Sequence, residues 1–222
     1  MENDLTISEK LLLLAVRPEK GGLRGISSQA LDFTLVGAAL LEMTLARNII
    51  LKDKRVEVIS EKSNSSLHRY ILERLTRSSR SRKLRHWFEP FSISNRKVRS
   101  ILYDLLIQKK EIRLENRRFL NFTWKKPYLG PGNHACNLVD KIKSLIIETP
   151  VNQEDIYLLA LLGPAELLSR IYPERSMRRP ARLKIKQYLE NNRTSENVIP
   201  AIEMAKAVKD AISSRRAAGS AV

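Results

Sequence analysis

The sequence predicts a mainly α-helical protein that folds as one domain and carries two β-hairpins. Apolar residues recur mostly at helical spacing, whereas only two short segments show the alternation that is typical of paired strands. No convincing linker or internal repeat divides the 222 residues, and 43% of them are hydrophobic. This content is sufficient for a single sizeable core.

Two helices are expected before the first hairpin. Thr6 or Ser8 can cap a helix over residues 9–16, which Pro and Gly chemistry then ends. Residues 27–48 are almost uncharged, begin with a serine cap and contain small residues that permit close helix approach. We therefore expect them to form the central helix. Residues 49–60 alternate around a "KDKR" turn and predict a hairpin.

The middle of the chain combines helical and strand patterns with a basic segment. Serine caps precede a helix over residues 65–75, and a cationic stretch follows over residues 76–87. A second capped helix is expected over residues 95–108. Residues 111–124 predict another hairpin, with "ENRR" as its turn, and the Pro and Gly content of residues 125–133 predicts a loop.

The C-terminal part is expected to be entirely helical. Its helices are predicted over residues 138–148, 152–172, 178–190 and 198–214. Gly163–Pro164 should break the second of these helices, and Pro180 should lie near the first turn of the third. We expect one domain over residues 5–212 and a flexible tail over residues 213–222.

Composition points to a polyanionic partner. The chain has 40 Lys and Arg against 24 Asp and Glu, for a formal charge of +16. Nucleic acid and anionic lipid both present phosphate at high density. Because no run of about 18 apolar residues occurs, a membrane-spanning helix is not expected. The single Cys136 cannot form an internal disulfide, which indicates a reducing, cytoplasmic setting.

The sequence contains no recognisable catalytic or metal-binding pattern. Its three histidines are scattered and show neither zinc nor triad spacing. The glycines of "KGGLRG" match neither the Walker nor the dinucleotide fingerprint, so turn formation is the better interpretation. We expect no enzyme activity, no metal and no cofactor.

The helix over residues 95–108 carries the candidate binding residues. Its core stripe includes Val98 and Leu102, so Arg96, Arg99 and Tyr103 are expected on the opposite face. Cations in a first turn oppose the helix dipole, and a negative partner at this place would reverse that penalty. Trp87, Phe88 and Phe91, just before this helix, are expected to pack in the core.

Four blocks of sequence resemble the Golgi phosphoprotein 3 family. They are "LTISEKLLLLAV", "ALDFTLVGAALLEMTLARNIIL", "NRKVRSILYDLLIQKKEIRLENRRFLNF" and "IYLLALLGPAELLSRIY", in this order. The resemblance implies a helical bundle wrapped by amphipathic helices, with a projecting β-hairpin. It also implies a cytosolic, non-enzymatic protein that binds phosphatidylinositol 4-phosphate on membranes. In eukaryotic members this lipid directs the protein to the Golgi, where it helps to retain glycosyltransferases.

The family's headgroup pocket is only partly present in this sequence. The resemblance places the arginine pair of the pocket at Arg96 and Arg99, which the chain keeps. Ser27 stands at the position of the pocket tryptophan, and Val36 stands at that of the central-helix arginine. Arg24 or Lys20, in the loop before the central helix, is the expected substitute. Strict selectivity for phosphatidylinositol 4-phosphate is therefore not expected, and a related phospholipid can also be the ligand.

Two further differences from the family concern the hairpin and the N-terminus. The family's hydrophobic hairpin tip serves membrane insertion or self-association, whereas Arg117 and Arg118 occupy the turn expected here, next to Phe119. A charged tip should lie on headgroups. Because the first block begins at Leu5, we expect no Arg-containing arm for coat recruitment, as in a prokaryotic-type or divergent member.

Three hypotheses follow from the sequence. The first is a peripheral protein on the cytosolic membrane face that binds anionic headgroups, retains membrane-protein clients and self-associates. The second is a nucleic-acid-binding protein that uses the basic helix and a wing-like hairpin. The third is a basic scaffold for another protein, with Arg96 and Arg99 solvated or paired with Asp104 or Glu89. Phe119, Phe122 and Trp124 are expected to pack within the hairpin.

Overall fold

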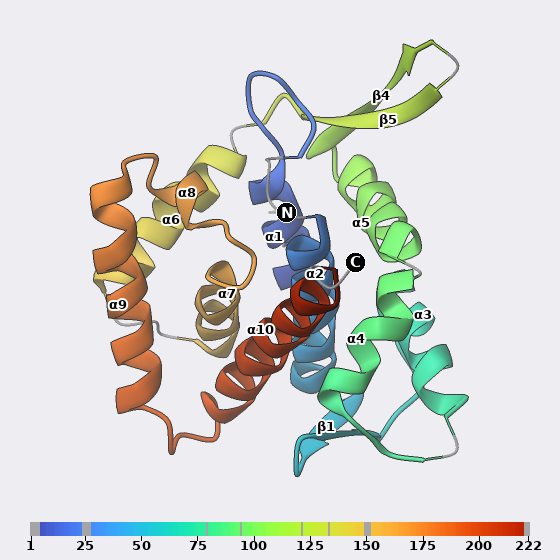
Figure 1. Cartoon of the computed structure of the whole chain (residues 1–222), viewed down its shortest axis with the longest axis vertical. Coiled ribbons are helices and arrows are strands. Elements are labelled where there is room, and N and C mark those ends of the chain that lie inside the picture. Colours follow the sequence, from blue (N-terminus) through green and yellow to red (C-terminus); the bar gives the residue numbers. More distant parts are fainter. Residues whose placement is uncertain are drawn as a thin grey trace.

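The computed structural model of the chain confirms the mainly α-helical class. It describes residues 5–23, 28–78, 80–93, 95–120, 122–132, 134–148 and 152–219. Within these ranges it contains ten helices and two small antiparallel sheets (Figure 1). The helices are α1 (Ile7–Ala15), α2 (Ser28–Leu45), α3 (Ser66–Thr76), α4 (Leu84–Ile93), α5 (Asn95–Gln108), α6 (His134–Ile147), α7 (Gln153–Leu162), α8 (Leu168–Ile171), α9 (Arg175–Asn191) and α10 (Ile199–Gly219). The strands are β1 (Ile49–Lys52), β2 (Arg55–Val58), β3 (Arg82–Lys83), β4 (Ile112–Phe119) and β5 (Phe122–Leu129).

Helix α2 is the central helix, as expected from its apolar sequence. It packs against α1, α4, α5, α7 and α10, which surround it (Figure 1). At Gly37 the backbones of α2 and α10 approach closely, because a Cβ added there would lie 2.8 Å from Cγ2 of Val208. The small residues noted in the sequence therefore permit close packing of α2 on α10.

Helix α1 begins with the predicted threonine cap. The Thr6 hydroxyl accepts a hydrogen bond from the Glu9 backbone N–H, and the Glu9 carboxylate accepts one from the Thr6 N–H at 2.7 Å. The same carboxylate accepts a hydrogen bond from Nζ of Lys109 at 2.7 Å. Since the Glu9 side chain is almost completely buried, this cap also ties α1 to the end of α5.

The first hairpin is larger than expected, because a third strand joins it. β1 and β2 pair from Ile49 opposite Val58 to a turn in which Asp53 and Lys54 have positive φ angles of 50° and 60°. β3 then pairs with β2 and leads directly into α4. The sequence predicted neither β3 nor α4 in this basic stretch. The expected core packing of Trp87, Phe88 and Phe91 on α4 is confirmed, since all three are buried.

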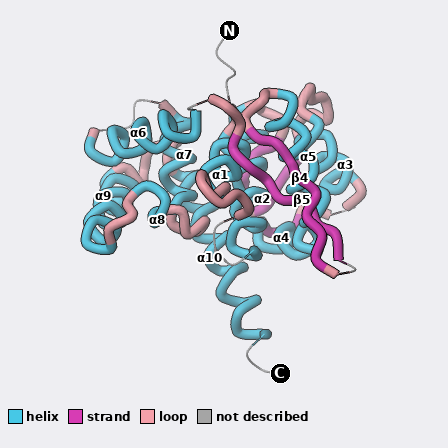
Figure 2. Tube along the Cα trace, turned by 90° about the horizontal axis from the view of Figure 1, so that it is seen from above, coloured by secondary structure: helices cyan, strands magenta, loops and turns pink. Residues whose placement is uncertain are grey.

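The second hairpin projects from one end of the molecule, as Figures 1 and 2 show. β4 and β5 pair from Ile112 opposite Leu129 to Phe119 opposite Phe122. The loop expected from residue 125 onward is wrong as far as Leu129, since β5 continues through it. Residues 17–22 pack against the base of this hairpin, where Gly22 donates a backbone hydrogen bond to Pro127 O at 2.6 Å.

The C-terminal helices follow the prediction except at their ends. The break expected at Gly163–Pro164 is confirmed between α7 and α8. α9 begins at Arg175, three residues before its expected start, so Pro180 lies inside the helix just after its first turn. α10 continues to Gly219, five residues beyond its expected end at residue 214.

Candidate functional site

Arg99 lies at the contact between α5 and the central helix α2. Its Nε donates a hydrogen bond to Oδ1 of Asp32 at 3.1 Å, and its Nη2 donates to the same oxygen. The Asp32 side chain is 7% exposed and the Arg99 side chain 21% exposed. The third hypothesis allowed a salt bridge of Arg99 with an acidic neighbour such as Asp104 or Glu89, and the described partner is Asp32 on α2. α2 covers this side of α5 and supplies a carboxylate there.

Tyr103 lies one turn after Arg99 and belongs to the same cluster. Burial raises the pKa of its phenol to about 12, while the charge of Arg99 lowers the pKa and that of Asp32 raises it. Burial is the largest of these effects, so the phenol stays neutral far above physiological pH. Tyr103 lies beside Arg99, as expected from their shared face, and its side chain is partly buried.

Ionisation of Tyr103 should make the protein unstable at high pH. Because the folded pKa is raised from 10.0 to about 12, the stabilisation is complete below pH 10 and is lost as the pH rises through 12. We expect the Tyr103 phenol to account for about 2 kcal/mol of that loss. The measurement is urea unfolding between these two pH values for wild type and Tyr103→Phe. If both chains lose stability equally, Tyr103 is not the group responsible.

The structure describes only some of the other residues that were expected to bind the headgroup. The backbone of Arg96 belongs to the first turn of α5, but its side chain lies outside the described residues, as do Arg24 and Ser27. Val36 is fully buried in the core, one turn after Asp32 on α2. Sequence reasoning did not include Asp32 in the site. The available signal was a single carboxylate in the first half of an otherwise apolar helix. A carboxylate buried in that way requires a partner.

The tip of the β4–β5 hairpin differs from the predicted turn. Arg117 and Arg118 lie within β4, and the chain reverses after Phe119, whose side chain is outside the described residues. Leu120 occupies the turn with a φ of 52° and is 75% exposed. The expectation of a charged tip is therefore wrong. Because Phe119 pairs with Phe122, the turn lies four residues further along the chain than "ENRR".

Cations lie directly behind this tip. Arg117 is paired across the strands with Trp124, which is 47% exposed and not packed as expected. Arg117 Nη2 donates a hydrogen bond to the Tyr128 hydroxyl at 2.6 Å, and this bond lowers the pKa of Tyr128. Arg118 Nε donates to Leu120 O at 3.2 Å. In the described part of the hairpin, an apolar side chain therefore lies at the tip, and two arginines precede it in β4.

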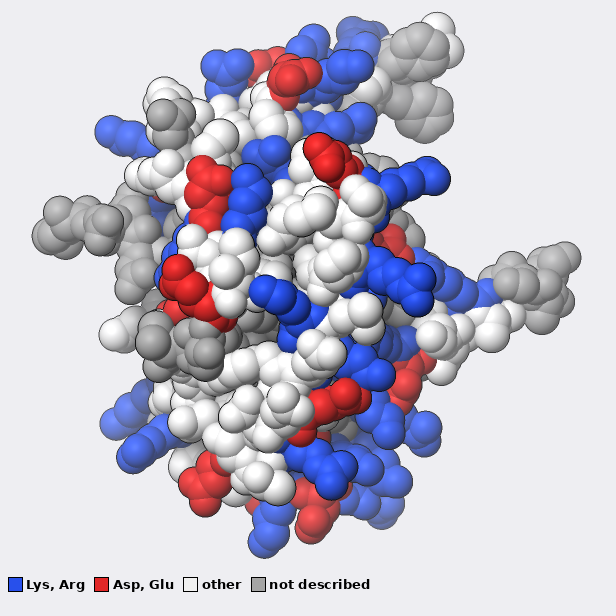
Figure 3. All heavy atoms as spheres, turned by 90° about the vertical axis from the view of Figure 1, so that its left-hand side faces the viewer, with Lys and Arg blue, Asp and Glu red and all other residues white. Residues whose placement is uncertain are grey.

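The rest of the described surface adds positive charge but no metal site. Lys and Arg side chains are spread over the face shown in Figure 3, with fewer Asp and Glu among them. Within the described ranges no three His, Cys, Asp or Glu residues are grouped so that they could hold a metal ion. In the same part of the chain, no helix is both long and apolar enough to cross a membrane.

Comparison with known families agrees with this architecture. The family model described as Golgi phosphoprotein 3 (GPP34) matches residues 7–213, nearly the whole chain. The chain belongs to the Golgi phosphoprotein 3 family. No curated protein matches it.

In this Golgi phosphoprotein 3 family member, the central helix contributes a carboxylate to the neighbourhood of the arginine pair. Asp32 takes two hydrogen bonds from Arg99, and buried Val36 adds no charge to the site. The positive potential at the start of α5 is therefore lower than the sequence indicates. The hairpin, by contrast, ends in the apolar residue Leu120, as the resemblance to the Golgi phosphoprotein 3 family implied for its members.

Proposed function

We propose that the chain is a peripheral membrane protein that binds anionic phospholipid headgroups. The observation that supports this most directly is the end of the β4–β5 hairpin. Leu120, in the turn, is 75% exposed, and Arg117 and Arg118 lie just before it in β4. Such an end can place an apolar side chain among the acyl chains while the cations remain at the phosphates.

The magnitudes favour weak, reversible attachment. Complete burial of a leucine side chain contributes about 1.5–3 kcal/mol. Each Lys or Arg near an anionic leaflet adds about 1 kcal/mol, which salt reduces. The hairpin cations Arg113, Arg117, Arg118, Lys125 and Lys126 together are therefore comparable to the apolar tip. Charge and apolar contact should both be required for binding.

We assign headgroup preference to the first turn of α5. Free backbone N–H groups at a helix N-terminus attract phosphate, and Arg96 and Arg99 are placed on this turn, with Arg24 in the loop before α2. Because Asp32 already pairs with Arg99, a phosphate must compete with a carboxylate. We therefore propose phosphatidylinositol 4-phosphate or a related phospholipid as the ligand, with modest selectivity.

The same proposal covers the protein's wider role. It acts without enzymatic chemistry on the cytosolic membrane face, as one domain over residues 5–212, and serves as an adaptor that retains membrane-protein clients. Packing of α1 and α10 on the same central helix supports the single domain. The exposed Trp124, together with Phe119, makes the hairpin the place for self-association.

The nucleic-acid alternative is less well supported by the position of α5. A recognition helix needs one free face to enter a DNA groove. α5 instead packs against α1, α2, α3 and α4, and Arg99 is held by Asp32. We therefore retain nucleic acid only as an outcome of the test.

The test is co-sedimentation with vesicles that contain phosphatidylinositol 4-phosphate, phosphatidylserine or neutral lipid only. Leu120→Ser should weaken binding to anionic vesicles by about tenfold, because a leucine side chain is no longer buried among the acyl chains. Leu183→Ser is the matched control, since Leu183 is also exposed, at 48%, but lies on α9. Equal binding by the two variants would contradict insertion of the tip. Binding of duplex DNA without binding of any anionic vesicle would favour the alternative.

A further inference from the structure

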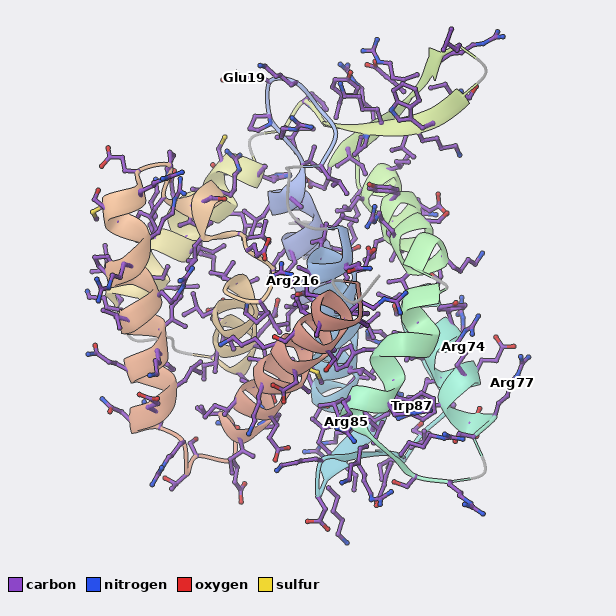
Figure 4. All side chains as sticks on the ribbon, viewed as in Figure 1. Glu19, Arg74, Arg77, Arg85, Trp87 and Arg216 are labelled. Carbon is purple, nitrogen blue, oxygen red and sulfur yellow. The ribbon has the colours of Figure 1, made fainter. Side chains whose placement is uncertain are left out.

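A second basic site lies away from both the hairpin and the Arg99–Asp32 pair. It is a groove of about 660 Å³ between the three-stranded sheet, the first turn of α4 and the C-terminal half of α10. Its floor includes Phe33, which follows Asp32 on α2 and packs edge-to-face on Phe88. Arg85 is seen between α4 and α10 in Figure 4. This volume is in the range of sites for small ligands.

Six cationic side chains line this groove. They are Arg55, Arg80, Arg82, Lys83, Arg85 and Arg215. They reach the groove from different elements: Arg55 from β2, the neighbouring β3 and α4 residues, and Arg215 from α10. Positive charge therefore surrounds the space on several sides and is not confined to one solvated helix face.

The fold holds these cations together against their repulsion. Arg55 and Lys83 are directly opposite one another in the β2–β3 pair, and like charges in that arrangement destabilise a sheet. Arg82 Nη1 lies 3.0 Å from Nε2 of His86, and because a guanidinium can only donate, the ring nitrogen is the acceptor. The imidazole therefore adds no negative charge to offset the cluster.

Compensating carboxylates are scarce in the described part of the groove. Asp210 is the one acidic residue that lines it. Within the described residues, Arg80, Lys83, Arg85 and Arg215 form no ion pair. All four are exposed at the mouth of the groove, so their charge is accessible to a ligand.

The start of α4 adds to this attraction. α4 has no acidic residue in its first turn, and Lys83 and Arg85 flank its first residue, Leu84. The N–H groups of a helix start carry partial positive charge, which attracts an anion and repels these cations. An anion in the groove would offset both the dipole and the side-chain charge.

We propose that this groove binds a compact anion that carries two or more phosphate groups. Guanidinium groups bind phosphate through paired hydrogen bonds, and cations on several sides match an anion with more than one phosphate. Asp210 and Ser214 can receive the hydroxyl groups of a polyol that carries them. The source is either a soluble polyphosphate or the headgroup of a phosphorylated lipid, and the site does not depend on insertion of the hairpin.

The test is calorimetric titration of the full chain with pyrophosphate and with inositol hexakisphosphate. The variant Lys83→Ala/Arg85→Ala/Arg215→Ala should bind both anions at least about tenfold more weakly, because each lost charge-assisted contact is of that size. The matched control is Arg175→Ala/Arg179→Ala/Lys184→Ala, which removes the same charge from exposed positions on α9. Circular dichroism melts check that both variants fold.

The outcomes separate the site from bulk charge and from membrane attachment. Selective loss in the groove variant supports the proposal, whereas equal loss in both variants, or no binding of either anion by wild type, overturns it. If the groove variant also binds phosphoinositide vesicles more weakly than wild type, the phosphates belong to a lipid headgroup. If its vesicle binding is unchanged, they belong to a soluble anion. Leu120→Ser should keep full affinity for soluble anions even if vesicle binding fails. If the groove variant lost only its binding to duplex DNA, the groove would be a nucleic-acid-binding surface, and this result would contradict the proposal.

Discussion

Replacing Asp32 with alanine is expected to lower the free energy of unfolding by about 3 kcal/mol. Asp32 is buried, and Arg99 donates two hydrogen bonds to its carboxylate from a site that is only 21% exposed. Removing the carboxylate leaves a guanidinium that water reaches poorly. The loss of this charge-assisted pair at a poorly hydrated site produces the effect.

The same variant tests whether Arg99 belongs to a headgroup site. Once Asp32 is gone, a phosphate no longer competes with a carboxylate, so vesicles with phosphatidylinositol 4-phosphate should bind Asp32→Ala more tightly than wild type. Asp104→Ala is the matched control, because Asp104 is exposed on α5 and the charge change is identical. Urea unfolding measures stability and co-sedimentation measures binding. An equal gain in both variants would mean that only net charge changed.

Replacing Glu42 with alanine should cost about 4 kcal/mol of unfolding free energy. This carboxylate, buried in α2, accepts hydrogen bonds from the Ser8 backbone N–H at 2.5 Å and from His68 Nε2 at 2.9 Å. Its loss leaves a buried donor in the first turn of α1 and another on α3 without a partner. The effect exceeds that at Asp32 because both partners are buried.

The control for Glu42 is chosen to separate burial from charge. Glu61→Ala removes the same charge from an exposed loop and should change stability by less than about 0.5 kcal/mol. Glu42→Gln keeps one acceptor oxygen, so its loss should be intermediate. Urea unfolding of the three variants gives the comparison. A loss at Glu42→Ala no larger than that at Glu61→Ala would show that the buried contacts do not stabilise the fold.

Much of the fold was predictable because local chemistry specifies it. The cap at Thr6 and the break after Leu162 follow from residues within one helical turn. α4 was missed because its start lies in a run of cations that favours a solvated loop. Its formation depends on burial of Trp87, Phe88 and Phe91 where α4 packs against α2 and α10, which are distant in sequence. Packing therefore outweighed local preference in this segment.

The hairpin shows why register is hard to predict from composition. "ENRR" is a reasonable turn by its polarity, yet it lies in β4. Pairing of Ile112 with Leu129 at the hairpin base sets the register, and only then does the turn fall after Phe119. A polar segment can occupy a strand of a projecting ribbon because both faces of the ribbon reach solvent.

Residue types and their local spacing were enough to establish the helical class and the positive charge. The three-dimensional fold determined which side chains lie next to one another. Arg99 meets a carboxylate 67 residues earlier in the chain, an apolar leucine occupies the hairpin tip, and six cations surround one groove. Helix propensity and charge act within a few residues, whereas these arrangements depend on side chains that only tertiary packing brings together.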